Sequence, residues 1–320
     1  MNFNSISTLE ESILKTGNNG EYELQKFSIP VKNEDLLLKG FLAKPKNRSK
    51  YYYAVVHPKK RIVLHYTAGH LRSDLGALTQ NEKHISVAFV IARNGIIYQL
   101  FSSKFWSGHI GKGIGNTNTG NAQDKVTIGI ELSNYGYLTE KNGNLETYYS
   151  RQKDKNGNQG PIDVYCSLAD KAAYTKTNTP FRGQSYYSSY SDMQYDSLII
   201  LLRYLTAQYN IPRKFLPATQ RFVATEKVLQ FKGIVTHINY RTDGKWDIGP
   251  GFNWQRVADG INAATYTSMF SDLENLEREI DGFENTGPRI ESEDQLEEFL
   301  PEAKSATLED EDYEEPENNE

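Results

Sequence analysis

Short, continuous apolar runs recur between residues 61 and 238 and predict the strands of a buried sheet. Their apolar residues do not alternate with polar ones, which indicates burial on both faces. Asn94-Gly95 joins two of the runs and predicts a β-hairpin. The runs are Arg61–Gly69, Ile85–Ile91, Ile96–Phe101, Val126–Asn134 and the one that begins at Gly233.

Two later segments carry apolar residues at helical spacing. Between Met193 and Tyr209 the apolar positions are Leu198, Ile199, Leu202, Leu205 and Tyr209. Asp192 is the expected N-cap of this helix, and Pro212 lies just past its end. A second helix is predicted from Asn253, its expected N-cap, to Ala264. Ser73–Lys83 is expected to form a short helix or a loop.

The segment before the first run is predicted to be a β-rich lead-in, residues 1–57, that packs on the main domain. Its first 20 residues are polar and are expected to be loosely held, and extended pieces follow from Glu21 to Val56. Residues 139–190 form a long excursion rich in Tyr, Asn, Gly and Ser without clear elements. Long segments of this kind are often functional, so we interpret it as a rim over the site.

The main domain is predicted to span residues 58–266, and the sequence after it is more polar and more highly charged. Residues 267–286 have Phe270, Leu273 and Ile280 at helical spacing among charges and predict an outer helix. Residues 287–320 are acidic. From Glu302 onward nine carboxylates accompany one lysine, a composition that cannot support a core and predicts disorder. This tail is expected to be a solvated appendage; the alternative is a segment that binds a chaperone or secretion machinery.

Composition narrows the class of protein. The 320 residues are 38% hydrophobic and 24% charged, and the net charge of -5 gives no basic footprint for nucleic acid. The single cysteine, Cys166, excludes an intramolecular disulfide framework and a thiolate-rich zinc cluster. No window approaches the roughly 18 apolar residues of a membrane span. The N-terminus lacks the pattern of a Sec signal, so we expect a cytoplasmic protein unless lysis or a non-Sec route releases it.

The chemistry-bearing residues cluster in the stretch from Gly233 to Gly251. An apolar strand there passes into a polar, Gly-rich loop, and His237 lies at the junction. Lys245 and Asp247 are two residues apart, so their side chains point the same way in an extended loop and Trp246 points the other way. These groups are parts of a metal-assisted hydrolase.

Two upstream strands offer what this stretch lacks. His65 comes at the end of the first core strand and supplies a second nitrogen, so His65, His237 and Asp247 would form a three-ligand zinc site that leaves one position for water. Glu131 interrupts an apolar strand, where an ionised carboxylate is costly unless it is paired or has a task. It is the candidate proton carrier, and Lys245 is the candidate donor to the oxyanion.

These residues resemble those of the zinc-dependent N-acetylmuramoyl-L-alanine amidases, the Amidase_2 superfamily that also includes the peptidoglycan recognition proteins. The resemblance spans about residues 61–264. It implies a central mixed β-sheet flanked by helices, an α/β (α+β) fold. The motifs that carry it are Leu64-His65-Tyr66-Thr67-Ala68-Gly69, Ile128-Gly129-Ile130-Glu131-Leu132, and His237-x7-Lys245-x-Asp247-x-Gly249-Pro250-Gly251-Phe252.

The resemblance also implies a reaction, hydrolysis of the amide between N-acetylmuramic acid and the L-Ala of the stem peptide. The closer branch has an Asp as third zinc ligand with a catalytic Glu and Lys, whereas the other branch has a Cys ligand and a catalytic Tyr. Ser86–Phe89, where that Tyr and a following His usually occur, has neither. His109, Tyr66 and Asn134 are candidate substrate contacts, and for His109 a loop residue without a role is an equal alternative.

Two other functions remain open at this point. The first is a recognition domain that binds muropeptides without cutting them. The second is a zinc amidase for another amide, with residues 139–190 shaping a different pocket. As an amidase, the protein fits a recycling enzyme, a lysin or an exported effector; the lead-in and the acidic tail favour the last two slightly.

Overall fold

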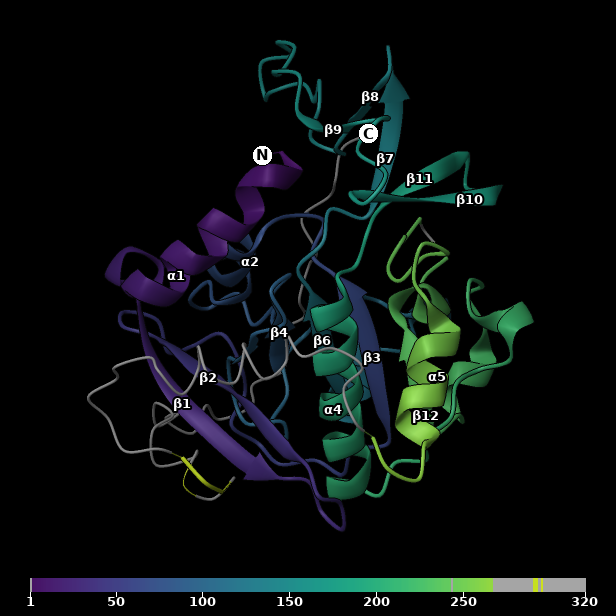
Figure 1. Cartoon of the computed structure of the whole chain (residues 1–320). Coiled ribbons are helices and arrows are strands. Elements are labelled where there is room, and N and C mark those ends of the chain that lie inside the picture. The colour runs from purple at the N-terminus through teal and green to yellow at the C-terminus, as the bar shows by residue number, and fades with distance from the viewer. Residues whose placement is uncertain (1, 243, 267–289, 293–294, 296–320) are drawn as a thin grey trace.

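Seven strands form one mixed sheet at the centre of the structure, a computed structural model that describes residues 2–242, 244–266, 290–292 and 295 (Figure 1). The order is β1-β2-β5-β4-β6-β3-β12. Strands β4, β6, β3 and β12 run parallel, and the pairs β1–β2 and β4–β5 are antiparallel. The strands are β1 (Tyr22–Pro30), β2 (Leu37–Pro45), β3 (Arg61–Tyr66), β4 (Phe89–Ile91), β5 (Ile97–Gln99), β6 (Thr127–Leu132) and β12 (Gly233–Thr236). The predicted central mixed sheet is confirmed.

The apolar runs are buried on both faces of this sheet, as their composition predicts. Side chains alternate between the two faces along a strand. In β3, Ile62 and Leu64 belong to the main core, whereas Val63 belongs to a smaller core on the opposite face with Ile110 and Val235. The odd-numbered residues of β3 therefore share a face away from the main core.

Helices cover the face of the sheet that carries the main core. Figure 1 shows α4 (Asp192–Gln208) lying across this face, beside α5 (Trp254–Asn262). The N-cap of α4 is Ser191, not the expected Asp192. Ser191 and Gln194 form a capping box in which each side chain accepts the other residue's backbone N–H. Asn253 caps α5 as predicted, accepting the Arg256 N–H at 3.0 Å.

The first 20 residues are not loose, because most of them form helix α1 (Ile6–Gly20). Ile6, Leu9 and Ile13 are buried on one face, a helical periodicity that the sequence interpretation missed among the polar residues. The lead-in is β-rich: its strands β1 and β2 belong to the central sheet, the same sheet as the strands after residue 57.

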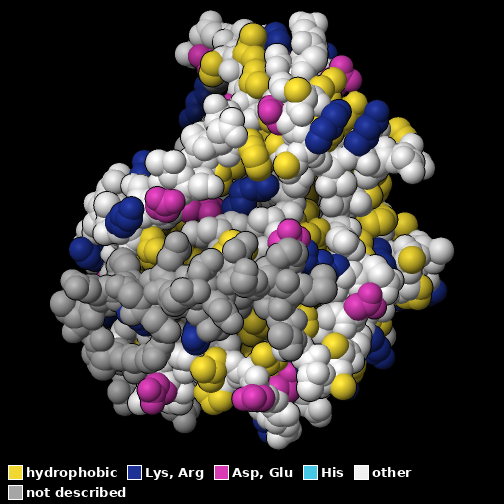
Figure 2. Space-filling model, viewed as in Figure 1, with side chains coloured by type: hydrophobic (Ala, Val, Ile, Leu, Met, Phe, Trp, Pro, Cys, Tyr) yellow, Lys and Arg dark blue, Asp and Glu magenta, His cyan; other side chains and the backbone are white. Residues whose placement is uncertain are grey.

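Residues 139–190 are not an irregular loop but supply most of a second sheet, the upper lobe in Figures 1 and 2. It is antiparallel, with the order β10-β11-β7-β8-β9, and has its own small core around Leu138, Leu145 and Tyr165. Its short strands and frequent turns hid the regular elements in the sequence. The strands are β7 (Tyr137–Lys141), β8 (Asn144–Glu146), β9 (Val164–Ser167), β10 (Tyr174–Phe181) and β11 (Gln184–Ser188).

Shorter elements complete the described chain. They are the helices α2 (Leu71–Leu78) and α3 (Ala122–Lys125) and the 3-10 turns η1 (Phe3–Ser5), η2 (Ile114–Asn116), η3 (Thr119–Asn121), η4 (Ala218–Gln220), η5 (Glu226–Leu229) and η6 (His237–Tyr240). Among the described residues, no helix has the length and apolarity needed to cross a bilayer.

A short piece of the C-terminal segment returns to the edge of the central sheet. Ile290 is fully buried and pairs with Phe27 of β1: its N–H donates to the Lys26 carbonyl at 3.1 Å, and its own carbonyl accepts the Ser28 N–H at 2.9 Å. The expected outer helix at 267–286 lies outside the described residues. So does the acidic tail, apart from residues 290–292 and 295.

Helix α1 is anchored to the β4–β5 hairpin through one buried carboxylate. Glu10 is 1% exposed, and its two oxygens accept the backbone N–H groups of Arg93 and Asn94 at 2.7 and 2.8 Å. We expect Glu10→Ala to lower the free energy of unfolding by about 2–4 kcal/mol, because two buried N–H groups lose their acceptors. Urea denaturation measures this change.

Glu11→Ala is the matched control, because that side chain is 62% exposed and makes a long ion pair with Lys15 at 3.8 Å. It should change stability by less than about 0.5 kcal/mol. Equal destabilisation by the two substitutions would contradict the anchoring role of Glu10.

Candidate metal centre

Three neighbouring parallel strands bring the predicted residues to one level. Glu131 of β6 and His65 of β3 are direct partners in the register. Thr236 of β12 is paired with Leu64, so His237, the next residue, comes level with His65. His65 is an odd-numbered residue of β3, so its side chain lies on the sheet face away from the main core. Glu131 and His237 are level with it on the neighbouring strands and lie on the same face.

The loop after η6 adds Asp247 to the two histidines. Its Oδ2 lies 2.9 Å from Nδ1 of His65 and 2.9 Å from Nδ1 of His237, and the two Nδ1 atoms are 3.0 Å apart. All three residues are buried. Trp246 points to the second sheet instead, where its ring lies 4.3 Å from that of Tyr137. The Asp247 side chain thus points to the two histidines, and the side chain of the preceding residue, Trp246, points away from them.

A backbone carbonyl fixes the tautomer of His237. Its Nε2 lies 3.1 Å from the oxygen of Ile110, which can only accept. The neutral ring therefore carries its proton on Nε2 and presents a lone pair at Nδ1. This is the usual arrangement behind a metal-ligating histidine.

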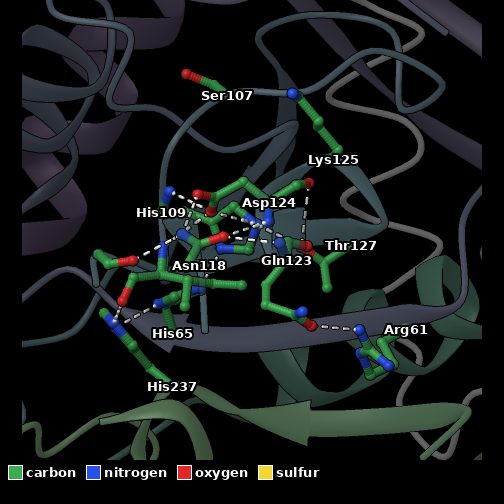
Figure 3. A network of polar contacts seen from close by, with 12 residues as sticks. Arg61, His65, Ser107, His109, Asn118, Gln123, Asp124, Lys125, Thr127 and His237 are labelled. Carbon is green, nitrogen blue, oxygen red and sulfur yellow. Dashed lines mark hydrogen bonds and ion pairs between the residues drawn. The ribbon is translucent and has the colours of Figure 1, made fainter. Parts of the chain in front are cut away.

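A relay of two side chains fixes the tautomer of His65 (Figure 3). The Thr127 hydroxyl donates to the Gln123 carbonyl at 2.9 Å, so it accepts from Nε2 of His109 at 2.9 Å. Nδ1 of His109 then has a lone pair and accepts from Nε2 of His65 at 3.0 Å. His65 therefore also presents a lone pair at Nδ1.

With both rings neutral, three acceptor atoms face one another, an arrangement that a cation stabilises. Burial lowers the pKa of His65 to about 4, so its imidazole is neutral at pH 7. Burial alone would raise the pKa of Asp247, but its contacts with the two histidines outweigh this and hold the pKa well below its usual range. Two neutral nitrogens and one carboxylate oxygen are a zinc donor set with ligand distances of about 2.0–2.2 Å. The residues fit the ion.

The loop that supplies His109 and Ile110 is held by buried residues that the sequence interpretation did not single out. One oxygen of Asp124 accepts the N–H groups of His109 and Ile110 at 2.9 and 3.0 Å, and the other accepts the Asn118 amide at 2.6 Å. A side chain at Gly129 would place its Cβ 3.2 Å from the His109 ring and 2.6 Å from Val87. In the sequence, Asn118 and Asp124 lie in an Asn- and Gly-rich loop, where turn formation is the default interpretation.

Glu131 lies beside the triad with an unsatisfied carboxyl group. Its Oε2 is buried and has no hydrogen-bond partner among the described residues. Burial, reinforced by the charges of Asp247 and Asp74, raises the pKa of Glu131 well above its usual value, and the Lys245 ammonium opposes this. The Lys245 charge also acts on His65. Glu131 and Lys245 therefore both lie within electrostatic range of the His-His-Asp triad.

The three candidate substrate contacts have different surroundings. Tyr66 lines a narrow cleft with Tyr187 and Tyr190 that is too tight to admit a water molecule. Asn134 also lines it, but its amide nitrogen donates to the carbonyls of residues 188 and 189 and its oxygen accepts the N–H of residue 136, so it ties β6 to the second sheet. His109 does not face the cleft; its side chain is 6% exposed and lies behind His65, which gives it a positioning role.

The family profile of N-acetylmuramoyl-L-alanine amidases, Amidase_2, matches residues 56–251, more than half of the chain. The chain belongs to this family. The match includes every residue of the triad together with Glu131 and Lys245. No curated protein sequence gives a significant match to the chain.

Solved structures of amidases are similar at low identity. AmiD from E. coli, in complex with an anhydro-N-acetylmuramic acid peptide, is 20% identical over 78% of this chain and 70% of its own, with a TM-score of 0.38. AmpDh3 from Pseudomonas aeruginosa, in complex with an anhydromuramic pentapeptide, is 17% identical over 79% and 76%, with a TM-score of 0.37. LysC from Clostridium intestinale is 14% identical over 66% and 93%, with a TM-score of 0.33.

The hydrogen bond from His65 to His109 predicts that His109 contributes to zinc affinity without being a ligand itself. We expect His109→Ala to weaken zinc binding by about 10–100-fold, because His65 is no longer held in the tautomer that presents Nδ1. His109→Gln should lose less, since its amide oxygen can accept the same hydrogen bond. Competition with a zinc chelator measures the affinity, and the visible spectrum of the Co²⁺-loaded protein reports the ligand geometry.

His57→Ala is the control, because the His57 ring lies edge-on to Trp106 at 6.2 Å and His57 is not part of the relay. Unchanged zinc affinity and an unchanged Co²⁺ spectrum in His109→Ala would contradict the relay.

Proposed function

We propose that the protein is a zinc-dependent amidase that hydrolyses the amide between N-acetylmuramic acid and L-Ala in peptidoglycan or its fragments. Within the family we assign it to the branch with an Asp ligand, here Asp247, and a catalytic Glu and Lys, here Glu131 and Lys245. The observation that carries the proposal is Oε2 of Glu131, which is buried without a hydrogen-bond partner among the described residues, beside a His-His-Asp triad. A domain that only binds muropeptides has no need of such a costly group.

The chain supplies the proton transfers that the reaction needs. A bound zinc ion would lower the pKa of a water molecule to about 7 and polarise the substrate carbonyl. The Glu131 carboxylate takes the proton of the attacking water and passes it to the leaving nitrogen. A raised pKa suits both steps, because the group must accept and then donate near neutral pH. The Lys245 ammonium stabilises the negative charge on the carbonyl oxygen.

The surroundings of Glu131 favour catalysis over binding alone. The carboxyl lies on the same sheet face as His65 and in register with it, so a metal ion held by the triad would bring its water to the side of the sheet that carries Glu131. The narrow cleft lined by Tyr66, Tyr187 and Tyr190 borders the same loop that provides Asp247, through Gly249 and Gly251.

The test is the activity of Glu131→Gln on purified sacculi with zinc present. Wild type should release new L-Ala amino termini, and Glu131→Gln should lower kcat by about 10²–10⁴-fold, because a neutral amide cannot shuttle a proton. Its zinc content should remain that of wild type, since Glu131 is not a ligand.

Three outcomes would oppose the proposal. Normal turnover by Glu131→Gln would remove Glu131 from the mechanism. Wild-type protein that retains zinc and binds sacculi without releasing L-Ala termini would favour the recognition domain. Products that keep the lactyl–Ala amide but have lost another amide bond would identify a different substrate.

A further inference from the structure

Two neighbouring tyrosines of the second sheet are half exposed on a turn. Tyr148 and Tyr149 are 48% and 49% exposed, and both follow strand β8 in the turn 147–150, named here the Tyr148 turn. Figure 2 shows hydrophobic side chains gathered on the upper lobe that this sheet forms. Exposed aromatic rings that lie together on a surface often mark an interaction site.

The Tyr148 turn is rigidly held, so the exposure of its rings does not come from a loose loop. The hydroxyl of Thr147 donates to Asp163 Oδ2 at 2.6 Å, and its N–H donates to the Asp163 carbonyl at 3.0 Å. The N–H of Ser150 donates to the Thr147 carbonyl at 3.1 Å, and its hydroxyl donates to Glu146 at 2.6 Å. A ligand that contacts these rings therefore loses little affinity to ordering the turn.

Two charged side chains next to the turn are paired with each other. Arg151 makes a bidentate ion pair with Glu146, with N–O distances of 2.9 and 3.0 Å. This pair compensates its own charges, which suits a neutral ligand at the neighbouring rings.

A row of aromatic contacts connects the turn to the metal loop. The ring centroid of Tyr148 is 5.5 Å from that of Tyr149 and 6.0 Å from that of Tyr137. Tyr137 in turn lies 4.3 Å from Trp246, the residue between Lys245 and Asp247. The exposed rings are therefore continuous with the loop that carries the third metal-ligand candidate.

We propose that Tyr148 and Tyr149 form a subsite for the neutral sugar rings of the glycan strand, outside the catalytic cleft. Pyranose rings present apolar C–H faces that pack on aromatic faces, and polar rims that remain in water, which matches half-exposed tyrosines. The assignment to peptidoglycan glycan rests on the proposed function. The subsite would hold polymeric substrate while the amide of one of its peptides is cut.

The direct test is calorimetric titration of the full chain with a β-1,4-linked N-acetylglucosamine tetramer, a glycan without peptide. Wild type should bind it, and Y148A/Y149A should bind at least about tenfold more weakly, because two stacking faces are removed. Y148F/Y149F keeps the rings and should retain most of the affinity. Leu37→Ala, at a 46% exposed position in β2, is the control for loss of an exposed apolar side chain elsewhere.

Hydrolysis gives a second readout with two substrates. Y148A/Y149A should digest sacculi more slowly than wild type but cleave a soluble muropeptide with one sugar at the wild-type rate. No tetramer binding by wild type, or equal binding by Y148A/Y149A, would overturn the subsite. Loss of free stem-peptide binding in Y148A/Y149A, with tetramer binding intact, would assign the surface to the peptide instead.

The two proposals can fail separately. If wild type cleaves neither substrate, the proposed amidase function fails, and the tetramer titration still decides the glycan subsite. If wild type cleaves both and Y148A/Y149A matches it on both, the subsite fails and the amidase function stands.

Discussion

The site depends on three electron-rich atoms held about 3 Å apart. Nδ1 of His65, Nδ1 of His237 and Oδ2 of Asp247 would repel one another, and burial removes the water that would otherwise separate them. A cation turns this repulsion into coordination. Without a cation, a histidine ring could relieve the repulsion by carrying its proton on Nδ1 and donating it to Asp247 or to the other ring. The surrounding chain opposes this tautomer.

The residues that keep these protons on Nε2 are not themselves candidate ligands of the cation. The Ile110 carbonyl holds the proton of His237 on Nε2, and His109 holds that of His65. Both come from one loop, which Asp124 fixes through two backbone N–H groups. The parallel register of β6, β3 and β12 then sets Glu131 and both histidines on one face, while helix α4 packs on the other. Catalytic geometry and core packing are thus separated by the two faces of one sheet.

The sequence indicated the strands that carry the candidate site better than it indicated the periphery. His65 and His237 stand at the ends of apolar runs and Glu131 interrupts one, so the same runs pointed to the strands and to the candidate residues. The role of Asp124 in holding the His109 loop was not predictable, since a polar residue in an Asn-rich loop has turn formation as its default role. Helix α1 was missed because its few apolar residues lie among polar ones, and the second sheet because its strands are short. In both regions long-range packing, rather than local pattern, decides the structure.

The most direct test of this account is anomalous diffraction at the zinc edge from crystals of the zinc-loaded protein. The account predicts one strong peak within about 2.0–2.2 Å of the His65 and His237 Nδ1 atoms and an Asp247 oxygen. A peak bound through Nε2 of either histidine, or no peak between the three side chains in protein that has been supplied with zinc, would contradict it.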